Sequence, residues 1–189
     1  ALIIKNYKNV KKKKSKSKKI ILIRPEEVEA AYASKSNKTV KIIKKIVEKF
    51  PNEEKIVLSR YENQSKELKK VFGSNISLFS KPINGQEFLR KTDCFVGSGG
   101  TMTAESAVLG VPSLRINTFV GKISYLEELE YVYGLTFGFL PEQELAFLSK
   151  LNELIKTKNL EKKWKKKRDI MLNNKTDLNN WMIKFFSDK

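Results

Sequence analysis

Short apolar runs alternate along the chain with longer segments in which apolar residues recur every three or four positions. The short runs predict β-strands, and the longer segments predict amphipathic helices. Strands are expected at Lys19–Ile23, Lys55–Leu58, Ile76–Phe79, Cys94–Gly97 and Pro112–Ile116. Strands that alternate with helices in this way are typical of a parallel sheet with helices on both faces. The predicted fold class is therefore α/β.

The clearest helical pattern covers Lys38–Phe50, where Val40, Ile43 and Val47 fall on one face and Pro51 ends the pattern. Further helices are expected at Ser65–Val71, in a short segment that ends at Lys91, and at Thr101–Leu109, Ile123–Tyr133, Glu142–Thr157, Leu160–Leu172 and Asp177–Phe186. These patterns predict a basic linker at residues 1–18, a ligand-binding α/β domain at 19–157 and a helical C-terminal tail at 158–189.

The formal net charge of +17 is the one feature of the composition that suggests nucleic acid as a partner. Lysine outnumbers arginine 33 to 5, however, and nucleic-acid recognition relies heavily on the bidentate guanidinium of arginine. The charge also gathers in two stretches, Lys11–Lys19 and Lys150–Arg168, which we interpret as a linker and a helix face. The composition therefore argues against nucleic-acid binding.

Histidine is absent and Cys94 is the single cysteine. The chain thus lacks the commonest general base and most of the side chains that bind zinc, and we expect no metal and no cofactor. A lone cysteine inside an apolar run fits a reduced, cytoplasmic setting. No apolar run approaches the roughly 20 residues that a membrane-spanning helix needs.

The most informative motif is the sequence GSGGT, which ends the predicted strand Cys94–Gly97 and opens the next helix. Gly99 and Gly100 let the backbone approach a ligand closely, and the helix start offers free N–H groups suited to a diphosphate. Glu105 lies one turn after Thr101 on the same helix face, where its carboxylate could accept hydrogen bonds from a ribose diol. A strand-to-helix turn without any ligand uses the same glycines, so the motif alone leaves a structural role open.

The stretch DCFVGSGGTMTAESAVLGVP at Asp93–Pro112 resembles the nucleotide-binding loop and helix of glycosyltransferase-B-fold (GT-B) proteins. It is most similar to the family known as domain of unknown function 354, whose members carry a similar Gly-x-Gly-Gly-Thr-Met, then Glu, then Leu-Gly-x-Pro. ILIRPEEVEAAY at Ile20–Tyr32 and IVLSRY at Ile56–Tyr61 are also similar. The resemblance implies a Rossmann-like domain, the C-terminal half of a two-domain archaeal or bacterial protein that binds a nucleotide-sugar.

Two better-understood groups share this loop. A bacterial cell-wall N-acetylglucosaminyltransferase has a glutamate seven residues after the loop serine, a spacing matched by Ser98 and Glu105. The resemblance implies that Glu105 binds the ribose of a UDP donor. In that enzyme the segment before the preceding helix contacts uracil, which by resemblance assigns Lys81, Pro82 and Ile83 to the base.

Non-hydrolysing UDP-N-acetylglucosamine 2-epimerases are also similar, with Ser-Gly-Gly on the loop and an arginine after the following strand, matched by Arg115. Their doubled glutamate after the loop is absent here. The strand-end residues Arg24 and Arg60 are candidates for phosphate binding, with an ordinary surface role as the alternative for each. The nucleotide-binding candidates are Arg24, Lys81, Pro82, Ile83, Ser98, Gly99, Gly100, Thr101 and Glu105, with Arg60 and Arg115 as further candidates.

The leading hypothesis is that the chain is the donor-binding half of a glycosyltransferase, with a UDP-sugar as its partner. The acceptor site and the general base are then expected in a missing N-terminal GT-B domain, so the chain is expected to bind nucleotide without turnover by itself. Half of a 2-epimerase-like isomerase is the first alternative. A basic module that binds RNA or a membrane is the second.

The predicted tail carries an apolar stripe at helical spacing, made of Leu178, Trp181, Met182, Phe185 and Phe186. The resemblance implies that these helices cross back to pack on the N-terminal domain. A basic helix with aromatic residues also fits peripheral contact with the anionic inner face of a membrane.

Overall fold

The structure, a computed structural model, describes residues 18–26, 38–80 and 84–187. Six strands form one parallel sheet in the order β3-β2-β1-β4-β5-β6. The strands are β1 (Ile20–Arg24), β2 (Glu54–Leu58), β3 (Ser77–Phe79), β4 (Cys94–Gly97), β5 (Ser113–Ile116) and β6 (Thr136–Phe139). The predicted Rossmann-like α/β fold is confirmed, and β6 is a strand that the sequence pattern did not predict.

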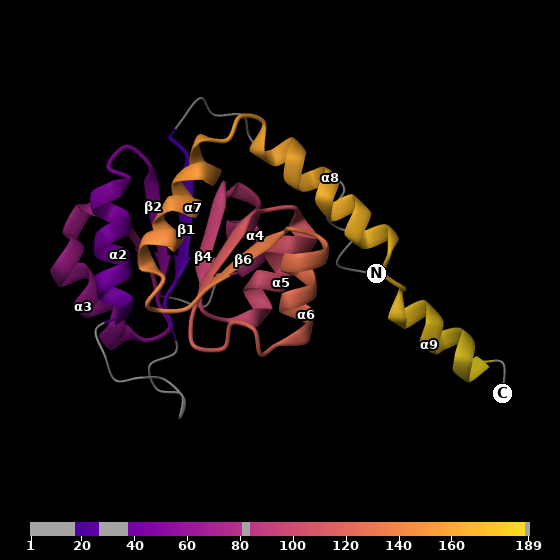
Figure 1. Cartoon of the computed structure of the whole chain (residues 1–189). Coiled ribbons are helices and arrows are strands. Elements are labelled where there is room, and N and C mark those ends of the chain that lie inside the picture. The colour runs from indigo at the N-terminus through magenta and orange to yellow at the C-terminus, as the bar shows by residue number, and fades with distance from the viewer. Residues whose placement is uncertain (1–17, 27–37, 81–83, 188–189) are drawn as a thin grey trace.

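Helices cover both faces of this sheet (Figure 1). Helices α2 (Lys38–Lys49), α3 (Glu62–Phe72) and α7 (Glu144–Lys156) pack on one face, and α4 (Gly85–Lys91) and α5 (Gly100–Leu109) pack on the other. The pleat of the central strand explains this, because Ile21 and Ile23 of β1 point to the first group while Leu22 points to the second. All three side chains are buried, as expected for a strand in the centre of a parallel sheet.

The segment between β5 and β6 differs from the single predicted helix at Ile123–Tyr133. It forms a short helix, α6 (Ser124–Glu127), that continues directly as a π-helical turn, η2 (Glu128–Val132). A short 3₁₀ turn, η1 (Gly73–Asn75), joins α3 to β3. Gly134 follows η2 with φ of 58°, a left-handed conformation that lets the chain turn sharply into β6.

The strand order determines where loops gather. From β1 the chain moves outward to β2 and β3, and then crosses back to β4, which pairs with the other side of β1. Successive connections therefore leave β1 and β4 in opposite directions. In sheets of this type, the carboxyl ends of such neighbouring strands flank a crevice where ligands bind.

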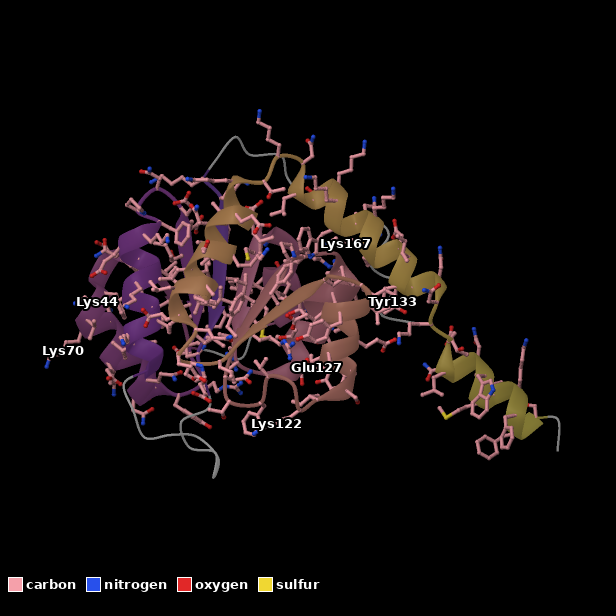
Figure 2. The ribbon with its side chains drawn as sticks, viewed as in Figure 1. Lys44, Lys70, Lys122, Glu127, Tyr133 and Lys167 are labelled. Atoms are coloured by element: carbon pink, nitrogen blue, oxygen red, sulfur yellow. The ribbon has the colours of Figure 1, made fainter. Side chains whose placement is uncertain are left out.

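The two C-terminal helices are packed very differently. Helix α8 (Leu160–Asn173) buries Leu160, Trp164 and Met171, and the indole Nε1 of Trp164 donates to the carbonyl of Leu135 at 2.9 Å. Helix α9 (Leu178–Ser187) projects away from the rest of the domain and has no buried residue (Figures 1 and 2). None of the helices in the described part of the chain is long and apolar enough to span a membrane.

Replacing Trp164 by alanine should lower the free energy of unfolding by about 3–5 kcal/mol, because the change removes a buried aromatic side chain and its hydrogen bond. Urea unfolding followed by circular dichroism measures this. The matched control is Trp181→Ala in α9, where half of the side chain is already exposed, and its unfolding midpoint should equal that of the wild type. Equal losses in the two variants would contradict the packing of α8.

Candidate functional site

A cavity of about 360 Å³ opens at the crevice between the carboxyl ends of β1 and β4. Its walls also include residues that follow β5, one side of α2 and the segment that leads into α7. Arg24 and Lys41 bring positive charge to it, and Glu26, Glu142 and Glu144 bring negative charge. A volume of this size is typical of small-molecule sites.

The loop from β4 to α5 forms one wall of the cavity through Gly97 and Ser98. Two side chains hold the carbonyl groups of this loop. The amide Nδ2 of Asn117 donates to the Ser98 carbonyl at 2.8 Å, and the hydroxyl Oγ1 of Thr103 donates to the Gly99 carbonyl at 2.7 Å. In a trans peptide the C=O and the following N–H point in opposite directions, so the N–H groups of Gly99 and Gly100 face away from these two side chains.

Asn117 itself is firmly held. It is buried, its Oδ1 accepts from the N–H of Phe119 at 2.7 Å, and its own N–H donates to the Phe139 carbonyl at 3.2 Å. Asn117 therefore ties the loop after β4 to the ends of β5 and β6. Asn117 carries no distinctive signal in the sequence, because an asparagine after a strand is an ordinary turn residue.

Gly99 and Gly100 have no side chains of their own, so side chains from other elements lie close to them. A Cβ on Gly100 would lie 2.1 Å from the hydroxyl of Tyr125 in α6, so only glycine permits this approach. A Cβ on Gly99 would lie 3.8 Å from Nη2 of Arg60, which places that guanidinium beside the loop. Arg60 is thus the strand-end arginine that lies against the loop. Tyr125 has no local sequence signal that could have identified it.

Arg24 lines the cavity, but its guanidinium also bonds to the neighbouring strand. Nη1 donates to the carbonyls of Leu58 and Ser59, both at 3.2 Å. Those carbonyls precede Arg60, whose backbone N–H donates to Oε1 of Gln64 at 2.9 Å. Arg24 therefore supports the turn that carries Arg60 and keeps a positive charge at the cavity wall.

Glu105 lies on the α4 side of the loop and is half-buried. Its Oε1 accepts from Nε2 of Gln86, at the start of α4, at 3.2 Å. The base-contacting candidates Lys81, Pro82 and Ile83 directly precede α4 in sequence but lie outside the described residues. Thr101 is exposed in the first turn of α5.

Arg115, in β5, is engaged by carboxylates of α6 and η2. Its side chain is fully buried, and its Nη2 pairs with Glu127 at 3.3 Å and with Glu130 at 2.5 Å. Glu127, labelled in Figure 2, also accepts from the N–H of Gly121, and Glu130 accepts from that of Gly138. The structure thus places Arg115 in an ion-pair cluster that joins β5 and β6 to α6 and η2.

Cys94 contributes no nucleophile to the site. It lies in the middle of the sheet, and burial raises the pKa of its thiol well above the usual range. The nucleophilic thiolate is therefore suppressed at neutral pH.

The parallel sheet, its strand order and the glycine loop at the carboxyl end of β4 define the chain as a Rossmann-like α/β domain. The chain belongs to the family described as "Protein of unknown function (DUF354)", whose model matches residues 4–182. No curated protein matches the chain.

Solved structures with this fold include both GT-B glycosyltransferases and UDP-N-acetylglucosamine 2-epimerases. The spinosyn rhamnosyltransferase SpnG in complex with thymidine diphosphate is 16% identical, with a TM-score of 0.59 over 81% of this chain and 41% of that one. MnaA from S. aureus with UDP is 16% identical, with a TM-score of 0.59 over 87% and 42% of the two chains. The UDP-GlcNAc 2-epimerase from Neisseria meningitidis bound to UDP-GlcNAc is 13% identical, with a TM-score of 0.51 over 91% and 46%. The chain thus spans less than half the length of each of these proteins.

Replacing Glu130 by alanine should lower the free energy of unfolding by about 3 kcal/mol, because it leaves the buried Arg115 guanidinium with only its longer ion pair. Chemical denaturation measures this. The matched control is Glu128→Ala, which removes an ion pair with Lys175 in which both side chains are well exposed. That loss should be below about 1 kcal/mol. A larger loss for the control would contradict the central role of the Arg115 cluster.

Proposed function

We propose that the chain binds a nucleotide-sugar, specifically a UDP-sugar, with its diphosphate at the start of α5. The observation that carries the proposal is the loop at Ser98 and Gly99, whose two carbonyls are held by Asn117 and Thr103, beside the cavity that Ser98 and Asn117 line. Backbone N–H groups at a helix start, together with the positive end of the helix dipole, suit a phosphate group. The UDP and thymidine diphosphate in proteins of the same fold support this choice of ligand.

The nucleoside would lie toward α4. Glu105 would accept hydrogen bonds there from both ribose hydroxyls, with one of its oxygens held by Gln86. The base would then reach toward Lys81, Pro82 and Ile83. The sugar would extend in the opposite direction, toward the cavity and Arg24.

In this arrangement the chain contributes to glycosyl transfer by stabilising the leaving nucleoside diphosphate. Negative charge grows on the diphosphate as the bond to the sugar breaks. The N–H groups of Gly99–Thr101 and the guanidinium of Arg60 face that charge from fixed positions, and Arg24 adds a further positive charge. Charge stabilisation of this preorganised kind is a large contribution to catalysis in many enzymes.

Transfer itself requires more than this chain. The acceptor site and the general base would lie in a second domain, which closes over the donor sugar. The chain alone is then a donor-binding unit that binds nucleotide without turnover.

A second candidate function is epimerisation at C2 of a UDP-sugar. The Ser98-Gly99-Gly100 loop and the similarity to a UDP-GlcNAc 2-epimerase favour it. The burial of Arg115 disfavours it, because the residue that matches the epimerase arginine is enclosed by two carboxylates. In a two-domain protein, release of UDP with transferred sugar would indicate a transferase, and interconverted UDP-sugars would indicate an epimerase.

Calorimetric titration of the chain with UDP, UDP-N-acetylglucosamine, GDP and ADP tests the proposal. We expect uridine nucleotides to bind preferentially and Glu105→Ala to weaken UDP binding about 10- to 100-fold, because hydrogen bonds to a carboxylate contribute about 1.5–3 kcal/mol.

Glu87→Ala is the matched control, because this carboxylate is exposed on α4 and pairs with Lys91 in its own helix. Its affinity for UDP should equal that of the wild type. Equal affinity for all four nucleotides, or an equal loss in both variants, would contradict the assignment of Glu105.

A further inference from the structure

Tyr125 of α6 reaches the nucleotide-binding loop, although nothing in the sequence marked it. Its hydroxyl lies 2.1 Å from the position that a Cβ on Gly100 would occupy, and Gly100 is the first residue of α5. The residue is 45% exposed. Within the described part of the chain, its hydroxyl makes no hydrogen bond. A polar group of a partly exposed residue thus lies at the edge of the loop.

The place that this hydroxyl occupies is chemically specific. In an α-helix each Cα–Cβ bond tilts toward the N-terminus, so a side chain on the first residue would project beside the free N–H groups of the first turn. The Tyr125 hydroxyl stands where that side chain would be. It therefore offers a hydrogen-bond donor beside the start of α5, as a serine or threonine at residue 100 would. The tyrosine side chain that carries it is longer and more rigid.

The Tyr125 hydroxyl and the Arg60 guanidinium both lie beside the loop whose carbonyls are bonded by Asn117 and Thr103. Asn117 and Thr103 bond to the carbonyls of Ser98 and Gly99. The N–H groups of Gly99 and Gly100 therefore point away from these two side chains. An anion bound by those N–H groups would have Arg60 on the side of Gly99 and Tyr125 on the side of Gly100. A tyrosine hydroxyl donates one hydrogen bond and suits a phosphate oxygen.

We propose that the Tyr125 hydroxyl donates a hydrogen bond to a phosphate oxygen of the bound nucleotide and is a specificity-determining residue for the diphosphate. This inference rests on the proposed nucleotide-binding function. It also assigns a reason to Gly100: any larger residue there would displace the tyrosine hydroxyl.

Tyr125→Phe tests the inference, because it removes the hydroxyl and keeps the ring. The dissociation constant for UDP should rise about 10- to 100-fold, the amount expected for one hydrogen bond to a charged group. Binding of uridine, which has no phosphate, should be unchanged, and so should the melting temperature. Tyr131→Phe is the matched control, because Tyr131 lies in η2 and is 77% exposed, and its UDP affinity should equal that of the wild type.

Gly100→Ala supplies a second, independent variant. When Tyr125 is retained, the alanine Cβ would meet the Tyr125 hydroxyl, so UDP binding should weaken. In the Tyr125→Phe background the nearest ring atom would be the Cζ at 3.3 Å, so the same change should cost little more. The two losses should therefore be strongly non-additive.

The outcomes separate this inference from the proposed function. If the wild type binds UDP and Tyr125→Phe binds it equally well, the role of Tyr125 is wrong while the nucleotide site stands. Equal weakening of UDP and uridine would also overturn it, because the hydroxyl would then act on the nucleoside or on the fold. If the wild type binds neither UDP nor uridine, both the proposed function and this inference fail.

Discussion

The rest of the structure depends on the need to bury both faces of the two central strands. β1 and β4 carry apolar side chains that point alternately to opposite faces, and each fully buried side chain of this kind contributes about 1.5–3 kcal/mol. One layer of helices cannot cover both faces. The chain therefore passes to the second face between β3 and β4, and this crossing brings the ends of β1 and β4 together under the cavity.

The loop between β4 and α5 is organised before any ligand arrives. Its two carbonyls are engaged by Asn117 and Thr103, and Arg24 supports the turn that presents Arg60. Folding has therefore already ordered these groups, and a ligand does not have to order them when it binds. Fixed donors of this kind raise the affinity for a ligand mainly because little conformational entropy is lost on binding.

Most of the fold could be predicted from the sequence because burial in a parallel sheet leaves a strong local pattern, as in Ile20–Arg24 and Cys94–Gly97. β6 was missed because Thr136–Phe139 is short and interrupted by Gly138, whose lack of a side chain makes room for Arg115 and Glu130. That spatial requirement is invisible in a single sequence.

The candidate site could be predicted only in part, because some of its contacts form between segments that meet only in the folded chain. Ser98, Gly99 and Gly100 adjoin one another in sequence, so their backbone chemistry can be inferred locally. The contacts of Arg115 and Tyr125 depend on α6 and η2, which pack beside the loop only in the folded chain. A resemblance to epimerases selected Arg115 by its order in the chain, whereas its surroundings are determined by partners 12 and 15 residues further on.

Helix α9 has a consequence for how the protein behaves in solution. With ten residues and no buried side chain, it is shorter than the roughly 12–15 residues at which an isolated helix becomes even marginally stable in water. Its own hydrogen bonds cannot keep it folded, so the helix–coil balance of this segment is decided by whether an apolar surface covers Trp181 and Phe185. The secondary structure of α9 therefore depends on the presence of a neighbouring apolar surface.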